Sequence, residues 1–345
     1  MAYTKPLFEK TKVDNAGIVL IDPSATNGDY EKALFIIDNW RSSHNFPLNT
    51  FRMWLRRKSK TIEKGSIVVQ RIKRLSSIRH KLQRMQKLKL SDMQDIGGCR
   101  VIFNNIGSVD KLIRAYKESD IRHKLVHIDD YIKCPKIRTG YRGIHLIYGY
   151  VSDKNNTYNG HRIEIQVRTQ LQHAWATAVE TVGTFKGQVL KSNQGDPDLL
   201  QFFKLTATLM ANLEKTSPAP GTPIGKKELL VELQKYKSQV EMIKHIKQYG
   251  EVLQQAEGLK DAHYFLIKLD TSQKVVTVKG FSAKDVKLAS EEYMAIEKNI
   301  NDQSTIDAVL VSAESLDALE RAYPNYFLDM KIFLDVLDRS IKFGA

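Results

Sequence analysis

Cysteine is scarce in this chain of 345 residues, which contains only Cys99 and Cys134. Neither belongs to a Cys-x-x-Cys pair or stands at a zinc-ligand spacing from histidine, which argues against a disulfide framework or a zinc site. Apolar runs of the roughly eighteen residues that a membrane-spanning helix needs are also missing. The first fifteen residues lack the apolar segment of a secretory signal. These absences predict a cytoplasmic protein without a membrane partner.

Acidic residues are the minority charge, and the formal net charge is +14. The basic residues crowd together between Arg52 and Lys89, where Glu63 is the only acid. Such a surplus attracts polyanions, namely nucleic acid, nucleotides or anionic lipid. The plain alternative is a basic surface that only keeps the protein in solution.

Helical and strand-like patterns alternate through the first half of the chain and predict an α/β fold. The predicted elements are helices at 29–45 and 48–60, a strand at 67–75, a helix at 76–88 capped by Ser76 or Ser77, a strand at 95–105, a helix at 108–119, strands at 140–152 and 161–169, and a helix at 170–185. We expect them to form a mixed five-stranded sheet flanked by helices, of the nucleotidyltransferase-like kind.

A proline- and glycine-rich stretch then divides the chain and predicts a linker. It is followed by a long predicted helix at 226–257, a β-hairpin at 263–281, a helix at 282–300, and a strand and helix that stop at Pro324. The predicted organisation is therefore an N-terminal extension (1–28), a first domain (29–213), a linker (214–227) and a smaller C-terminal α/β domain (228–345).

Two carboxylates are candidates for metal binding or catalysis because they lie at or within predicted strands. Asp95 precedes the strand "GGCRVIF", and Glu164 lies in "RIEIQVRT", whose alternation points Ile163, Ile165 and Val167 to one face. Two acids on neighbouring strands can hold Mg²⁺ together with substrate phosphates. A single Asp at a strand start is more often a turn residue.

Basic and aromatic residues accompany these acids. "QRIKRLSSIRHKLQR" puts cations on a strand–turn–helix that can grip a triphosphate, although the same pattern also describes a solvated basic face. "KIRTGYRGIHLIYGY" exposes the ring of Tyr141 beside Lys136, Arg138 and Arg142, and its spacing puts His145 on the same side as Tyr141. Rings that stack on bases and cations that meet phosphates are the usual means of holding nucleotides.

Four ordered blocks resemble the RelA/SpoT synthetase domain, a family of ATP-dependent pyrophosphokinases that act in alarmone metabolism and the stringent response. The blocks, within residues 30–185, are "RIKRLSSIRHKLQR", "DIGGCRVIF", "DYIKCPKIRTGYRGIHLIY" and "EIQVRTQLQHAWATAVE". The last block resembles the small alarmone synthetases, a group that includes toxin-like members. The His-Asp motif of the family's hydrolase domain is missing, so we expect no alarmone hydrolase activity.

The resemblance implies a role for each matching residue. ATP, the pyrophosphate donor, would be held by Arg71, Lys73, Ser77, Lys81, Arg84 and Arg100, with Arg71 and Arg100 on the two faces of the adenine. Asp95 would bind Mg²⁺, and Glu164 would orient or deprotonate the attacking 3′-hydroxyl and share the metal. The acceptor would meet Tyr141, which would stack on its base, together with Lys136, Arg142, His145, Gln166 and Arg168.

The acceptor itself stays open. GDP or GTP would give (p)ppGpp, some relatives use adenine nucleotides, and a toxin of a toxin–antitoxin or phage-defence system would modify the 3′ end of tRNA. The basic cluster Arg52, Arg56, Arg57, Lys58 and Lys60 suits tRNA. A non-catalytic nucleotide- or RNA-binding module is the alternative of another class. The C-terminal unit would be structural, would regulate the enzyme through an antitoxin or trigger protein, or would mediate homo-oligomers.

Overall fold

A computed structural model describes residues 3–119, 121–186, 190, 195–248, 253–258, 262–270, 272–273, 275–300, 304–327 and 330–342. Within these residues the central feature is one mixed β-sheet. Its strands are β1 (Ile67–Ile72), β2 (Gly97–Phe103), β3 (Lys124–Asp130), β4 (Ile144–Gly149), β5 (Arg162–Thr169), β6 (Leu253–Glu257), β7 (Tyr264–Asp270), β8 (Val275–Phe281) and β9 (Ile306–Ser312).

The strand order in this sheet is β3-β4-β5-β2-β1-β9-β7-β8-β6. The first five strands are the mixed sheet expected of the first unit, since β2 and β5 run parallel while β1–β2 and β4–β5 are antiparallel. The fold class predicted from the sequence is confirmed. The sheet does not end at β1, however, because β9 pairs with it in the antiparallel sense. Strands of the C-terminal unit therefore continue the same sheet.

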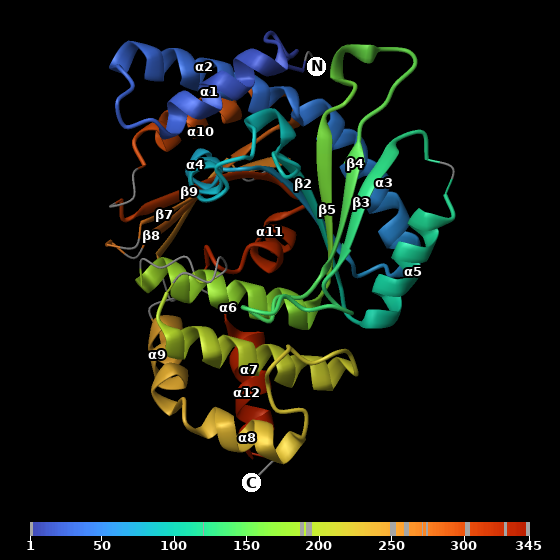
Figure 1. Ribbon diagram of the computed structural model, residues 1–345, viewed down its shortest axis with the longest axis vertical. Helices are drawn as coiled ribbons and strands as arrows, with labels where there is room; N and C mark the ends of the chain where they lie inside the picture. Colours follow the sequence, from blue (N-terminus) through green and yellow to red (C-terminus); the bar gives the residue numbers. More distant parts are fainter. Residues whose placement is uncertain are drawn as a thin grey trace.

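Helices cover both faces of the sheet, and a further helical layer lies beyond them (Figure 1). They are α1 (Lys10–Ile21), α2 (Asn27–Ser43), α3 (Asn45–Ile62), α4 (Leu75–Arg84), α5 (Ile106–Lys117), α6 (Gln170–Lys186), α7 (Pro197–Glu214), α8 (Lys226–Gln234), α9 (Lys237–Gln248), α10 (Val286–Lys298), α11 (Leu316–Ala322) and α12 (Lys331–Lys342). No helix among the described residues has both the length and the apolar character needed to cross a bilayer.

Strand alternation decides which helices each face receives. Val68, Val101 and Ile165 point to one face and form a buried cluster with α3 and α5. Val69 and Ile102 point to the other face, where α11 covers them. Further along the same strands that second face carries Arg71 and Glu164, so α11 packs on the face that holds predicted site residues. In Figure 1 α11 occupies the hollow of the curved sheet, above α6.

The predicted helix at 226–257 is wrong as a single element. The structure has α8, α9 and then β6, which pairs in parallel with β8; residues 249–252 lie outside the described residues. Leu229 and Leu233 of α8 and Val240 of α9 are buried against α6 and α7. Pairing with an existing sheet edge overrides the local helical preference of the last residues.

The predicted cap of α4 is also wrong. This helix begins at Leu75 with Arg74 in the N-cap position, so Ser76 and Ser77 stand inside its first turn. Arg74 makes no side-chain capping hydrogen bond.

Two histidines are buried where α2 meets α3 and the start of β5. His44 Nδ1 donates to the Trp40 carbonyl at 2.8 Å, and His161 Nε2 shares a hydrogen bond with the Ser43 hydroxyl at 2.8 Å. Their ring centroids are 4.5 Å apart. Burial lowers the pKa of His161 to about 4, and burial with the nearby His161 places the pKa of His44 well below its ordinary value.

We expect this pair to weaken the fold in mild acid. Between pH 6.5 and 4 the unfolded chain binds protons at both rings and the folded chain does not, so the free energy of unfolding falls as the pH falls. The slope is about 1.4 kcal/mol per pH unit for each ring. Urea unfolding at pH 7.5, 6 and 5 measures it, with His161→Gln as the comparison. An equal pH slope in that variant would contradict this assignment.

Candidate active site

The polar ends of β1, β2 and β5 meet at a hollow of about 390 Å³ on the α11 face of the sheet. The residues around it are Arg71, Lys73, Asp95, Gly98, Cys99, Arg100, Glu164, Gln166 and Tyr323. All but three of them, Gly98, Cys99 and Tyr323, were predicted to be site residues. The sequence blocks therefore converge on one place.

Strand register explains how the hollow forms. Arg71 on β1, Gly98 on β2 and Glu164 on β5 stand in one row across the sheet. Gly98 has no side chain, and a Cβ added there would meet nothing closer than a backbone oxygen at 4.0 Å. The centre of the row is therefore open, with a guanidinium on one side and a carboxylate on the other.

Asp95 is held by two lysines. Its Oδ2 accepts from Lys73 Nζ and its Oδ1 accepts from Lys81 Nζ, each at 2.8 Å. Burial alone would raise the pKa of Asp95, but the two ammonium groups outweigh it and hold that pKa well below its usual range. Burial in turn lowers the pKa of Lys73, although Asp95 partly compensates. Asp95 is thus a permanent anion, with a cation on each oxygen.

Glu164 is paired with His145 on the neighbouring strand. His145 Nδ1 lies 2.9 Å from Glu164 Oε1, and Gln166 Nε2 donates to Oε2 at 2.6 Å. Burial opposes the charge on both groups, but each stabilises the ionised form of the other. The pKa of Glu164 falls to about 2, and that of His145, which Tyr141 also raises, reaches about 9.

The remaining contacts close a ring of hydrogen bonds around this pair. Arg168 Nη2 donates to Gln166 Oε1 at 3.0 Å and to the Tyr141 hydroxyl at 2.6 Å. That hydroxyl in turn lies 2.6 Å from His145 Nε2. Burial would raise the pKa of Tyr141, but Arg168 and His145 outweigh it and lower it to about 8. The ring fixes the rotamer of Glu164 from both sides.

These properties narrow the role of Glu164. A carboxylate with a pKa of about 2 is a weak acceptor of a hydroxyl proton near neutral pH. The same carboxylate, fixed and permanently charged, is well suited to orient a hydroxyl or to bind a cation. The contacts to His145 and Gln166 are those of a fixed, ionised carboxylate, which suits the orienting and metal-binding roles predicted for Glu164.

The residues present fit a magnesium ion. Asp95 and Glu164 line the same hollow, and the negative charge of Asp95 affects the pKa of Glu164. No group of three or more His, Cys, Asp or Glu side chains among the described residues could hold a metal alone. That donor set suits Mg²⁺, which is bound by one or two carboxylates and completed by substrate phosphates.

The two arginines predicted to enclose adenine lie next to a C-terminal residue. The guanidinium carbon of Arg100 is 5.4 Å from the centroid of the Tyr323 ring, and Arg100 Nη1 donates to the Ala322 carbonyl at 3.0 Å. Burial and the nearby Arg168 lower the pKa of Arg100 to about 10. Burial opposes the charge of Arg71, but Tyr323 and Glu180 outweigh it and raise its pKa. Tyr323 thus lies against the group predicted to stack on adenine.

The other predicted ATP residues are on α4. Lys81 reaches the site through Asp95, whereas Ser77 and Arg84 do not line the hollow, and Arg84 is exposed.

One expectation for the acceptor side is wrong. Tyr141 is not an exposed ring: it is 8% exposed, with Lys136 Nζ 5.2 Å from its centroid and Arg168 on its hydroxyl. Arg142 is buried as well and donates to the Ala207 carbonyl of α7 at 3.1 Å, and its contact with the acceptor stays a prediction. Both residues follow Gly140, whose positive φ of 73° turns the chain into the α7 helix layer before β4 begins. The glycine, which permits this backbone conformation, is the only local signal that the sequence offered for the turn.

Sequence reasoning also missed Tyr323. It lies in "YPNY", which was interpreted only as the end of a helix, more than 150 residues from Glu164. No local pattern connects the two, because β9 brings this segment to β1 only in the folded sheet.

The high pKa of His145 depends on Glu164. We expect Glu164→Gln to lower the pKa of His145 from about 9 by about one unit or more, because burial then acts with less opposing charge. An NMR titration of the imidazole measures the change. Asp153→Asn, at an exposed acid, is the control. A His145 pKa still near 9 in Glu164→Gln would contradict the pairing.

Comparison with known proteins identifies the same segment. Residues 70–188 match the model of the region found in RelA / SpoT proteins. A GTP pyrophosphokinase, YwaC of Bacillus subtilis (strain 168), is 33% identical over 113 residues, which span 31% of this chain and about half (52%) of that relative.

Solved structures of similar proteins include two small alarmone synthetases from Bacillus subtilis. Synthetase 1 with its product pppGpp is 20% identical and has a TM-score of 0.44. The match covers 55% of this chain and 94% of the synthetase 1 chain. Synthetase 2 is 24% identical and has a TM-score of 0.42, covering 54% and 95%. The family model over residues 70–188 and the similarity to YwaC confirm, for this segment, the family resemblance predicted from the four sequence blocks.

Proposed function

We propose that the chain is an ATP-dependent pyrophosphokinase that transfers the β,γ-pyrophosphate of ATP to the 3′-hydroxyl of a guanine nucleotide. The observation that carries the proposal is the pairing of Asp95 with Lys73 and Lys81 beside a fixed, ionised Glu164 in one hollow. Phosphoryl-type transfer needs positioned cations and an oriented nucleophile rather than covalent chemistry, and this hollow offers both.

The ATP side works by exchange of ion pairs. Lys73 and Lys81 neutralise Asp95 at 2.8 Å each, and an entering triphosphate offers both lysines new anionic partners. Asp95 is then free to hold Mg²⁺, which would neutralise charge on the transferred group. Arg71 and Arg100 supply flat guanidinium surfaces for the adenine.

The acceptor side depends on Glu164. Its carboxylate accepts a hydrogen bond from the 3′-hydroxyl and aims that oxygen at the β-phosphorus. The new bond joins the 3′-oxygen to the β-phosphorus, and the bond between the β-phosphorus and the α,β-bridging oxygen breaks. AMP leaves with the bonding electron pair, and the hydroxyl proton passes to water. His145, Gln166 and Arg168 keep the carboxylate in position throughout.

A tRNA 3′ end is the second candidate acceptor, favoured by α3. Arg56 and Arg57 are exposed on this helix, and Lys58 and Arg52 are half-buried. Arg56 is paired at 2.6 Å with Glu314 and Lys58 Nζ lies 5.5 Å from the centroid of the Trp54 ring, so the exposed Arg57 would meet a phosphate backbone most directly.

A transfer assay decides between the acceptors. With ATP labelled at the β- or γ-phosphate and Mg²⁺, we expect label to pass to GDP or GTP, and Glu164→Gln to lose at least about 100-fold in rate because the hydroxyl is no longer oriented. The Asp153→Asn variant should react like the unaltered protein.

Label on deacylated tRNA alone would replace the guanine nucleotide by the second candidate. Label on neither acceptor, or an unaffected Glu164→Gln variant, would overturn the proposal.

We also propose that the C-terminal unit regulates the enzyme by closing the adenine side. The Tyr323 ring lies against the guanidinium of Arg100, and the Ala322 carbonyl accepts a hydrogen bond from the same guanidinium. ATP and Tyr323 then compete for one guanidinium. A trigger protein that moves α11 would open the site.

Tyr323→Ala should bind ATP about 10-fold or more tightly than the unaltered protein, because Arg100 no longer has to release a ring. Isothermal titration below the unfolding temperature measures this affinity, and Tyr323→Phe, which keeps the ring, should change it little. Equal or weaker ATP binding by a folded Tyr323→Ala variant would contradict the regulatory proposal.

A further inference from the structure

The connection between β1 and α4 is held partly by residues of the C-terminal unit. It contains Lys73 and leads into the helix that carries Lys81, so its shape decides where both lysines meet Asp95. The side chain of Arg74, in the middle of the connection, pairs with Asp307 of β9 and donates to the Tyr326 hydroxyl at 3.2 Å. The connection therefore does not rest on its own unit alone.

Glu297, near the end of α10, reaches the first turn of α4. Its Oε1 accepts from the Leu75 backbone N–H at 2.6 Å and from the Tyr293 hydroxyl at 2.7 Å. Its Oε2 pairs with Arg41 Nη2 at 2.7 Å. Glu297 is 5% exposed, so these charge-assisted contacts replace its hydration almost completely.

The contact to Leu75 supplies what α4 lacks. Arg74 offers no side-chain cap, and the first turn of α4 contains no acid. A helix N-terminus leaves backbone N–H groups without partners and carries a partial positive charge. A carboxylate there accepts a hydrogen bond from such an N–H group and interacts favourably with that charge. Here that carboxylate comes from 222 residues away in sequence.

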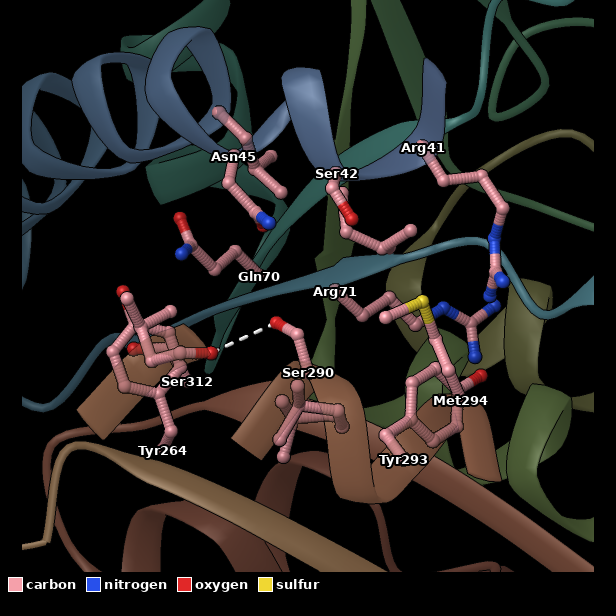
Figure 2. Close-up of a pocket in the computed structure, with 15 residues that line it drawn as sticks. Arg41, Ser42, Asn45, Gln70, Arg71, Tyr264, Ser290, Tyr293, Met294 and Ser312 are labelled. Atoms are coloured by element: carbon pink, nitrogen blue, oxygen red, sulfur yellow. Dashed lines mark hydrogen bonds between the residues drawn. The ribbon is translucent and has the colours of Figure 1, made fainter. Parts of the chain in front are cut away.

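Arg41 completes a clamp on the same connection. Its Nε donates to the Lys73 carbonyl at 3.1 Å, and its Nη1 pairs with Asp38 at 3.0 Å. Arg41 and Glu297 thus hold the backbone at Lys73 and at Leu75, one residue to either side of Arg74. Figure 2 shows Arg41 descending from α2 toward Tyr293 of α10.

The clamp lies beside a pocket that opens between the end of α2 and α10, with Arg41 and Tyr293 among the residues that line it (Figure 2).

We infer that Glu297 is a positioning residue for the phosphate-binding turn: it caps α4 from the C-terminal unit and so sets Lys73 and Lys81 for the ATP phosphates. The inference rests on the proposed function. It gives the C-terminal unit a second role. The unit covers the predicted adenine site through Tyr323, and through Glu297 it also positions the lysines that bind the phosphates. A signal that moves α10 would weaken the grip on phosphate.

Glu297→Ala tests this in the full chain. We expect at least a 10-fold weaker binding of MgATP by calorimetry, little change for adenosine, and faster amide hydrogen exchange in the first turn of α4. Glu297→Gln keeps an oxygen for the Leu75 N–H and should recover part of the affinity. Glu292→Ala on the same helix, whose partner is Lys279, is the matched control and should bind MgATP normally.

The outcomes separate this inference from the proposed function. A folded Glu297→Ala variant that binds MgATP like the unaltered protein overturns the inference alone. Equal weakening for adenosine and MgATP also overturns it, because the loss would then be general. An unaltered protein that binds MgATP but transfers no label leaves the inference standing and overturns the proposed activity, whereas one that binds no MgATP overturns both.

Discussion

Burial of charge on one face of the sheet is the constraint on which the site depends. Glu164 is only 9% exposed, and a carboxylate taken out of water needs hydrogen-bonding or charged partners. His145 and Gln166 occupy its oxygens, and Arg168 and Tyr141 hold those two in place. The alternation of β5 is what makes this possible, because it places the polar side chains on the face opposite the apolar core. A rigid, permanently ionised carboxylate is the result, and its chemistry follows from that rigidity.

The pairing of β9 with β1 has consequences on both faces of the sheet. The chain enters β9 from α10, which packs on one face, and leaves it toward α11, which packs on the other. Because β1 carries Arg71 and leads to Lys73, each flank of the nucleotide site receives one contact from the C-terminal unit. Tyr323 meets Arg100 on the adenine side, and Glu297 meets α4 on the phosphate side. The pairing of β1 with β9 thus brings the second unit to both sides of the donor site.

The sequence was informative where local periodicity and short motifs carry the information. The two faces of "RIEIQVRT" and four of the five strands of the first unit could be predicted from periodicity, and the cluster of Asp95, Glu164 and the basic residues from the resemblance of the sequence blocks; the edge strand β3 was missed. Contacts between distant segments could not. Tyr323 and Glu297 reach the site through the order of the strands, and the cap of α4 lies 222 residues from the helix it caps. Tyr141 was misplaced because the turn at Gly140 buries a ring that composition alone suggested was exposed.

The charges around the hollow explain how its cations are tolerated without a substrate and why they can still bind a triphosphate. Cations outnumber carboxylates there, yet Asp95 and Glu164 each neutralise their nearest neighbours, which limits repulsion among Lys73, Lys81 and the two arginines. A triphosphate brings the negative charge that these cations lack, so its binding exchanges internal ion pairs for external ones instead of creating charge in a low-dielectric site. Such an exchange is close to balanced. Small displacements of the groups that fix the lysines, Glu297 among them, can then decide whether ATP is held.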